Sequence, residues 1–291
     1  MNAIESQAMR MSPSDAARLR LLSLPGEPLF IADWDGVLMI HYQVDADRLA
    51  RIVPFPLDLR NGNAFVGLVG FTMRRMRPRF GGRLAAWLLK PIATHAFLNV
   101  RTYVRRDDEP GIYFLAEWLS NRLSVALGPR LFGLPYRLGK IDYQHHSQKV
   151  GKGAFHRVPF PKISDEMKSL PTLSLRGRVE DSAGNGILTY RGALDPTIKP
   201  CACDRDSLDE WLMERYTAFT HSAGKIGFFR VWHPPWPQTT LELEVIERSL
   251  LDINWPFFSD AAFVGANYSP GVRNVWMGWP HPLICQRAAL A

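Results

Sequence analysis

Residues 97–143, FLNVRTYVRRDDEPGIYFLAEWLSNRLSVALGPRLFGLPYRLGKIDY, decide the fold of this chain. The segments 97–104 and 111–119 are rich in β-branched and aromatic residues, and the polar turn RRDDEP separates them. Two such runs joined by a short polar turn are typical of a β-hairpin. The sequence therefore predicts an antiparallel strand pair at the centre of the fold.

A helix is predicted directly after this hairpin. Leu123, Leu127 and Leu131 recur every four residues, which is the spacing of one helix face. Gly133 and Pro135 follow, and these residue types end helices.

Two charged residues lie inside the strands of the hairpin. Arg101 alternates with Val100 and Thr102, so its side chain faces away from its neighbours and toward an enclosed interior. Glu117 has the same setting within its own strand. A buried charge is costly without a partner or a ligand. Arg101 and Glu117 therefore either neutralise each other or mark a binding site.

The remaining pattern is mainly β with a few covering helices. Two glycines in the apolar run 64–73 indicate a strand that bends, as strands do in barrels. The other strands are predicted at 36–42, 177–180, 187–190, 226–232 and 239–246, and helices at 14–22, 45–53 and 207–213.

Several motifs occur in an order that resembles one family. The first is the pair His41-Tyr42. The others are NVRTYV at 99–104, PGIYF at 110–114, RLFGLPY at 130–136, ERY at 214–216 and HPPWP at 233–237. Together they resemble the YqjF-like family of uncharacterised bacterial proteins, domain of unknown function 2071, in the acetoacetate-decarboxylase-like superfamily. The resemblance covers residues 28–282.

This resemblance implies an α+β, mainly β fold. We expect an acetoacetate-decarboxylase-like antiparallel β-barrel, closed or partly closed, with a few covering helices. A single domain is expected over 28–282, preceded by an arm and helix at 1–27 and followed by a tail at 283–291. No linker or low-complexity tract divides the 291 residues.

The cysteine content favours a cytoplasmic protein without a metal or cofactor. Cys201, Cys203 and Cys285 are too few and too unevenly spaced for the disulfide framework of a small secreted domain. The Cys201/Cys203 pair has no second pair or suitably spaced histidine to complete a zinc site.

The net charge of +7 does not indicate nucleic-acid binding. The basic residues of segment 74–90 cluster around the apolar run LAAWLL, and no nucleic-acid recognition motif accompanies them. A solvated loop is one interpretation of this segment, and weak contact with an anionic membrane surface is the other. No apolar run is long enough to span a bilayer. A homo-oligomer is compatible with this composition.

The common catalytic motifs are absent from the sequence. It contains no G-x-S-x-G, P-loop, G-x-G-x-x-G or H-E-x-x-H pattern, which removes the main support for hydrolase, kinase and dehydrogenase readings. Acetoacetate decarboxylase forms a Schiff base through a lysine, a known example of an activated nucleophile. The resemblance puts Tyr136 and Arg137 after Pro135, where that enzyme has lysines, and an arginine stays protonated. A lyase reading would therefore rest on Lys140.

Two classes of function remain. The first is an enzyme or binder of a small anionic or carbonyl-containing molecule inside the barrel, and the second is a non-catalytic binding or assembly protein with the same fold. If the protein is an enzyme, we assign proton transfer to Glu117, Tyr136 and His233. Lys140 would be the nucleophile only if the enzyme were a lyase. The ligand-binding residues would be Arg101, Tyr103, Arg137, Arg215 and Trp236.

Overall fold

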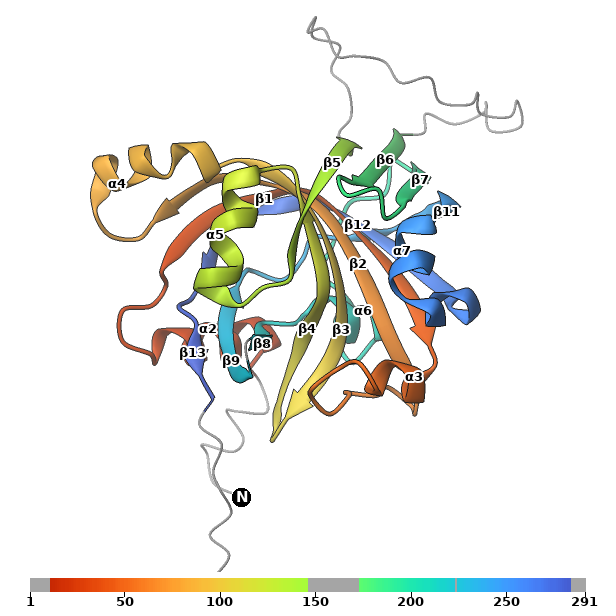
Figure 1. The fold of residues 1–291 in the computed structure, drawn as a ribbon, viewed down its shortest axis with the longest axis horizontal. Helices are drawn as coiled ribbons and strands as arrows, with labels where there is room; N and C mark the ends of the chain where they lie inside the picture. The colour runs from red at the N-terminus through yellow and green to blue at the C-terminus, as the bar shows by residue number, and fades with distance from the viewer. Residues whose placement is uncertain (1–10, 146–172, 223, 284–291) are drawn as a thin grey trace, which may run out of the picture.

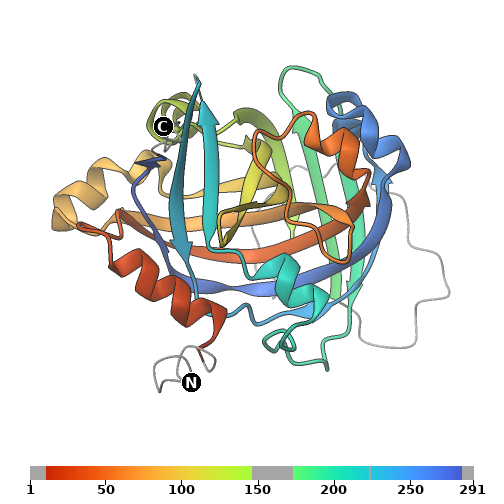
Figure 2. The same ribbon diagram turned by 90° about the horizontal axis from the view of Figure 1, so that it is seen from below.

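The computed structural model describes residues 11–145, 173–222 and 224–283. Its centre is a ring of strands, seen in Figures 1 and 2. In spatial order these strands are β4 (Glu109–Leu119), β3 (His95–Arg106), β2 (Ala64–Pro78), β1 (Phe30–Val44), β12 (Ala262–Met277), β9 (Lys225–Trp232) and β8 (Thr217–Ser222). The ring returns to β4 because Ile112 and Tyr113 pair with Ala218 and Phe219 of β8.

A second layer of strands continues the sheet beyond β4. It consists of β5 (Tyr136–Gln144), β6 (Leu173–Asp181), β7 (Ile187–Leu194) and β11 (Glu242–Glu247). Two short strands complete the sheet, β10 (Thr239–Thr240) against β12 and β13 (His281–Pro282) against β9. The mainly β, partly closed barrel expected from the sequence is confirmed.

Helices cover the ring and its edges. They are α2 (Pro13–Leu22), α3 (Ala46–Ala50), α4 (Gly82–Leu88), α5 (Arg122–Phe132), α6 (Leu208–Met213) and α7 (Ser249–Asn254), with 3-10 turns η1 (Lys90–Ile92) and η3 (Pro256–Asp260). None of the helices in the described ranges is long and apolar enough to cross a lipid bilayer.

Both faces of the central strands are buried, which positions the site. On β1 and β2, Met39 and Val69 point into the ring, whereas Leu38 and Leu68 pack on the other face. Because successive strand residues point to opposite faces, each central strand contributes to both cores. A charged residue on the inner face therefore has no direct access to solvent.

The predicted hairpin is confirmed, and the barrel around it is mostly antiparallel. Strands β3 and β4 pair antiparallel, with Asn99 opposite Glu117. The two exceptions are at β4, which pairs in parallel with both β5 and β8. The parallel pairing with β5 is reached through α5, because parallel neighbours require a crossover connection.

The longest strand, β12, was not predicted from the sequence. It contains Pro270 and Gly271, residue types that usually interrupt strands, and Gly271 and Asn274 have φ angles of 110° and 56°. The pairing of β1 with β12 shifts register between Ala32 and Trp34, so a bulge accommodates the irregular residues. The predicted strand 239–246 is likewise divided, into β10 and β11.

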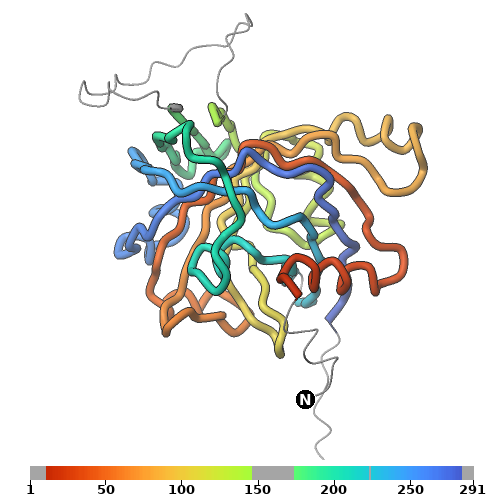
Figure 3. The backbone as a smooth tube through the Cα atoms, turned by 180° about the vertical axis from the view of Figure 1, so that it is seen from behind, coloured from red at the N-terminus to blue at the C-terminus, as the bar shows by residue number. Residues whose placement is uncertain are grey.

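The predicted helices form with small changes in their ends. The Ser12 hydroxyl accepts a hydrogen bond from Asp15 N and starts α2. This helix packs against β9 (Figure 3), and its Leu21 is buried. Helix α3 is shorter than the predicted 45–53, because Asp45 is its N-cap and the helix ends at Ala50. Gly133, with φ 66°, ends α5 as expected.

Candidate functional site

Four neighbouring strands bring polar side chains to one place on the inner face of the barrel. His41 of β1, Gly67 of β2 and Arg101 of β3 are consecutive partners across the sheet. In the adjacent row, Asn99 of β3 faces Glu117 of β4. Since residues two apart on a strand share a face, Asn99 and Arg101 point to the same interior.

Of these side chains, Asn99 and Arg101 line a small internal cavity of about 30 Å³. That volume has room for about two water molecules. The cavity is lined by polar groups together with apolar and aromatic side chains, among them Trp34, Asn99, Arg101, Phe114, Arg215, Tyr216, His233 and Trp236.

Arg101 is the cation at the centre of this interior, only 7% exposed. Its Nη2 donates to the carbonyl oxygen of Leu212 at 3.3 Å, and its Nε has no hydrogen-bond partner in the described part of the chain. Gly67 leaves the space that Arg101 and Tyr103 occupy. A Cβ at Gly67 would lie 2.9 Å from the Tyr103 hydroxyl oxygen.

Glu117 is the buried acid of the same interior, 2% exposed. Burial raises the pKa of its carboxyl to about 8, and Arg101 opposes the shift. Tyr136 is its parallel partner on β5, and burial, with the Glu117 charge next, raises the pKa of the Tyr136 hydroxyl. Glu117 is therefore predominantly protonated at neutral pH and has a proton to donate.

Arg215 approaches the cavity from the segment after α6. Its Nη1 donates to Asp58 Oδ2 at 2.7 Å and its Nε to the Trp211 carbonyl oxygen at 2.7 Å. The guanidinium lies 4.2 Å from the centroid of the Trp211 ring. Its Nη2 has no partner among the described residues, so one donor is free although the side chain is firmly held.

Three packed rings, those of Tyr216, His233 and Trp236, form another part of the cavity wall. The His233 ring lies 4.4 Å from Trp236 and 4.7 Å from Tyr216, between ring centroids. Its Nδ1 is 2.8 Å from the Pro234 carbonyl oxygen, and burial lowers its pKa to about 4. The indole Nε1 atoms of Trp34 and Trp236 are buried and have no partner within the described ranges.

His41 and Asn99 belong to this site but were not among the predicted site residues. His41 Nε2 lies 3.0 Å from Asn267 Oδ1. Asn267 Nδ2 donates to Gln238 and Asp209, so Oδ1 is its accepting atom and His41 Nε2 carries the hydrogen. Strand alternation from Arg101 would have found Asn99, whereas His41 depends on the register of β1.

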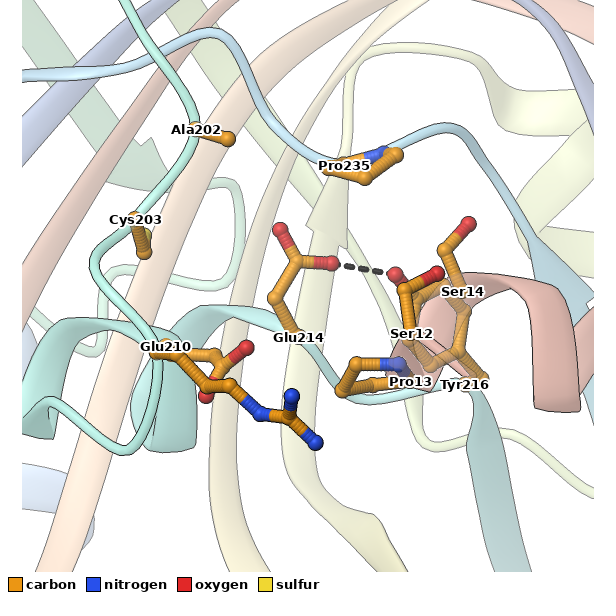
Figure 4. A pocket seen from close by; sticks show the side chains of 10 residues that line it. Ser12, Pro13, Ser14, Ala202, Cys203, Glu210, Glu214, Tyr216 and Pro235 are labelled. Carbon is orange, nitrogen blue, oxygen red and sulfur yellow. Dashed lines mark hydrogen bonds between the residues drawn. The ribbon is translucent and has the colours of Figure 1, made fainter. Parts of the chain in front are cut away.

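A second pocket of about 240 Å³ lies on the other side of Tyr216. Figure 4 shows Glu214 and Tyr216 in its wall, with the Tyr216 hydroxyl donating to Glu214 Oε2. The other oxygen, Glu214 Oε1, accepts from Trp236 N at 2.9 Å. Because Tyr216 lines both spaces, its ring is part of the wall between this pocket and the internal cavity.

The structure brings most of the predicted site residues together. Arg101, Arg215, His233 and Trp236 line the cavity. Burial raises the pKa of the Tyr103 hydroxyl and Arg101 opposes that shift, so Tyr103 adjoins the arginine. Glu117 and Tyr136 interact electrostatically beside them.

Arg137 and Lys140 lie elsewhere. Arg137 stacks on Trp118, at 5.2 Å from the ring centroid, and donates to Asn254 Oδ1 on the outer face of β5. The Lys140 side chain is 74% exposed and pairs with Glu180 at 3.0 Å. Neither side chain lines the cavity. Arg137 faces away from Tyr136 because adjacent strand residues alternate, and Lys140 lies further along β5, where its side chain is in solvent.

The described residues contain no group of three or more His, Cys, Asp or Glu side chains arranged to hold a metal ion. Cys201 is exposed, and burial raises the pKa of the half-buried Cys203 thiol to about 12. A thiol with such a pKa is protonated, which is unfavourable for metal binding.

Comparisons with solved structures identify the fold. An acetoacetate decarboxylase-like enzyme from Sphingomonas wittichii RW1 is similar with a TM-score of 0.55 at 15% identity, covering 88% of this chain and 94% of that chain. Acetoacetate decarboxylase from Legionella pneumophila subsp. pneumophila str. Philadelphia 1 is similar with a TM-score of 0.54 at 13% identity, covering 91% of this chain and 94% of that chain. The enduracididine biosynthesis enzyme MppR complexed with pyruvate is similar with a TM-score of 0.55 at 14% identity, covering 90% of this chain and 92% of that chain.

Sequence comparison identifies the family. The uncharacterized protein YqjF of Bacillus subtilis (strain 168) is 28% identical over 225 residues, which cover 75% of this chain and 78% of YqjF. The model of the DUF2071 family, described as an uncharacterized conserved protein, matches residues 31–272. The expected resemblance is therefore confirmed, and the chain belongs to the DUF2071 family.

Proposed function

We propose that this protein binds a small anionic or carbonyl-containing molecule in the internal cavity, without forming a Schiff base. Any transformation of that ligand proceeds by proton transfer through Glu117, with Tyr136 and His233 beside the path. The reaction class is then acid–base chemistry on a small keto or carboxylic acid.

The observation that carries this proposal is a set of buried N–H donors around one cavity. Arg101 Nε, Arg215 Nη2 and the indole Nε1 atoms of Trp34 and Trp236 have no partner among the described residues, and all four side chains line the cavity. Leaving a buried donor unpaired costs about 1–3 kcal/mol. A ligand rich in acceptor oxygens would satisfy them, and two of the four donors carry positive charge.

The protonation states favour a carbonyl-bearing ligand. Glu117, with its pKa raised by burial to about 8, is a donor at neutral pH. A protonated carboxyl donates a hydrogen bond to a carbonyl oxygen and supplies a proton when negative charge develops there. His233, with its pKa lowered by burial to about 4, is neutral and can accept a proton.

The lysines that the structure describes do not support imine chemistry. Lys90, Lys140, Lys199 and Lys225 are all exposed, and none of them lines the cavity. Imine formation needs a neutral amine, usually obtained by burial or a neighbouring cation. The lyase alternative through Lys140 would require that exposed side chain to leave Glu180 and enter the cavity.

One observation favours the alternative of binding without catalysis. The cavity of about 30 Å³ is narrow, and Trp34, Phe114 and Trp236 occupy much of its wall. This space is far smaller than the roughly 300 Å³ or more of common ligand pockets, so little room is left for a substrate to react in. Whether or not the protein is catalytic, we expect a ligand of few non-hydrogen atoms.

We further propose that the protein acts in the cytoplasm, because its cysteines are sparse.

The neighbour with bound pyruvate gives the first probe to use. MppR is similar in fold and its structure holds pyruvate, a small 2-oxo acid. We therefore expect thermal stabilisation by pyruvate or acetoacetate. Borohydride treatment in their presence, followed by intact-mass measurement, should give no adduct. A stable adduct would refute the non-covalent proposal, and the labelled lysine would identify the nucleophile.

A further inference from the structure

The helices α4 and α5 carry apolar side chains that nothing in the described structure covers. In α4 and the turn before it, Phe80, Leu84, Trp87 and Leu88 are exposed by between 62% and 70%. Large apolar side chains gathered in one short segment at this exposure mark an interaction surface.

The outward face of α5 continues this pattern. Leu123, Leu127 and Leu131, which repeat every four residues, are exposed by 43% to 59%. The residues that the helix buries are instead the small Ser124 and Gly128. Gly128 lies against Tyr136, since a Cβ there would be 2.1 Å from the ring. The apolar stripe of α5 therefore points away from the barrel.

The two helices belong to neighbouring segments. Asn121, the N-cap of α5, donates from Nδ2 to the carbonyl oxygen of Pro91 in η1, at 2.7 Å. Met76 N donates to the carbonyl oxygen of Ala93 and closes the base of the α4 arm. Figure 1 shows α4 projecting from the upper left of the ring and α5 lying over the strands next to it. We call these exposed residues the α4–α5 surface.

The charge of this surface has one sign. No Asp or Glu occurs in residues 73–95 or 119–141. The exposed basic residues beside the apolar side chains are Arg79, Arg83, Lys90, Arg122 and Arg130. The ion pairs found among the described residues include none of these five.

We infer that the α4–α5 surface docks on the face of an anionic lipid bilayer. Trp, Phe and Leu side chains insert at the headgroup boundary, while arginines and lysines beside them attract anionic headgroups. A second copy of this chain fits less well, because a symmetric contact would set the same basic residues against each other. This docking is independent of the ligand proposed for the internal cavity.

Vesicle flotation of the full-length protein tests the inference. The protein should float with phosphatidylcholine vesicles containing about one third phosphatidylserine, and stay with the soluble fraction when the vesicles are phosphatidylcholine alone. High salt should release it, because screening weakens the attraction to the headgroups. The double variant Trp87→Ser/Leu88→Ser should lower the partition coefficient at least about tenfold.

Matched controls separate docking from a general change in solubility. Ile253→Ser changes an apolar residue of α7 that is 59% exposed, outside the α4–α5 surface, and should leave flotation unchanged. Arg83→Glu should weaken binding about fivefold or more, whereas Arg51→Glu, an exposed arginine after α3, should not.

Three outcomes would overturn the inference. The first is no flotation with anionic vesicles, and the second is flotation that the α4 variants leave unchanged. In the third, Trp87→Ser/Leu88→Ser converts an oligomer to a monomer, as measured by light scattering, and the wild-type protein does not float. The surface would then be a contact between copies of this chain.

Discussion

Arg101 and Glu117 share the buried interior of the barrel but do not form an ion pair with each other. Arg101 donates to the backbone of Leu212, and the pKa of Glu117 is raised to about 8 by burial in spite of the arginine charge. Mutual neutralisation, one of the two interpretations of this pair, is therefore not what the structure contains. The charge of Arg101 is left to act on another group.

The buried carboxyl of Glu117 predicts a pH dependence of stability. Between pH 4.5, its ordinary pKa, and about 8, the folded protein holds a proton that the unfolded chain releases. The contribution of Glu117 to the unfolding free energy therefore falls as pH rises through this window, by about 1.4 kcal/mol per unit for a full proton.

Glu117→Gln should remove this decline. Urea unfolding between pH 6.5 and about 8, above the range in which the buried histidines act, should give a flatter profile for the variant, with the largest gain over wild type at the alkaline end. The exposed Glu242→Gln serves as the control and should follow the wild-type profile. Identical slopes for wild type and Glu117→Gln would show that Glu117 is ionised when folded.

The buried His233 makes the opposite contribution to stability, which is lost as the pH falls below 6.5. Its folded pKa of about 4 lies below the ordinary 6.5, so the unfolded chain takes up a proton first as pH falls. Stability should be fully present above pH 6.5 and decline toward pH 4. His41 and His95 add to this decline, because burial lowers their pKa values to about 3 and about 4.

His233→Phe should keep the stacking with Tyr216 and Trp236. It should remove the part of the loss of stability between pH 6.5 and about 4 that comes from protonation of His233. The exposed His221→Phe is the comparison and should leave the decline unchanged. If the unfolding free energy of His233→Phe falls as steeply below pH 6.5 as that of the wild type, His233 does not contribute to the loss of stability in acid.

Gly67 and Gly265 lie on either side of His41 and give a matched pair of substitutions. Gly67→Ala should destabilise the protein by about 1–3 kcal/mol, because its Cβ would lie 2.9 Å from the buried Tyr103 hydroxyl. Gly265→Ala has open space around its Cβ and should be nearly neutral. Equal melting temperatures for the two variants would contradict the crowding at Gly67.

Arg101→Lys should weaken the binding of every small carboxylate found to stabilise the protein, by about tenfold or more. A lysine loses the planar fork of donors and the Nε that faces the interior without a partner. Arg137→Lys, on the outer face, is the matched control and should bind as wild type does. Titration calorimetry with the folded variants decides this, and unchanged affinity in Arg101→Lys would make Arg101 structural.

The sequence predicted the parts of the fold that local pattern controls. The hairpin of β3 and β4 and the inward direction of Arg101 and Glu117 follow from alternation within single strands. β12 was missed because Pro270 and Gly271 resemble a break, and only pairing with β1 makes that segment a strand. Long-range register cannot be read from local pattern.

The same limit applies to the site. Asn99 was within reach of the alternation argument, but Trp34 and His41 join the site through the pairing of β1 with β2. Arg137 and Lys140 were candidates only through the resemblance; Arg137 stacks on Trp118 at the outer face of β5, and Lys140 is exposed beside Glu180. The leucines of α5 were correctly assigned to one helix face, although that face is exposed.

The most direct test of the central claim is a crystal structure of the protein soaked with pyruvate or acetoacetate. We predict ligand density in the internal cavity, with its carboxylate or carbonyl oxygen within hydrogen-bonding distance of Arg101 Nε or Arg215 Nη2. No bond should join the ligand to a lysine. A cavity without ligand at saturating concentration, or a ligand bound covalently to a lysine, would contradict the proposal.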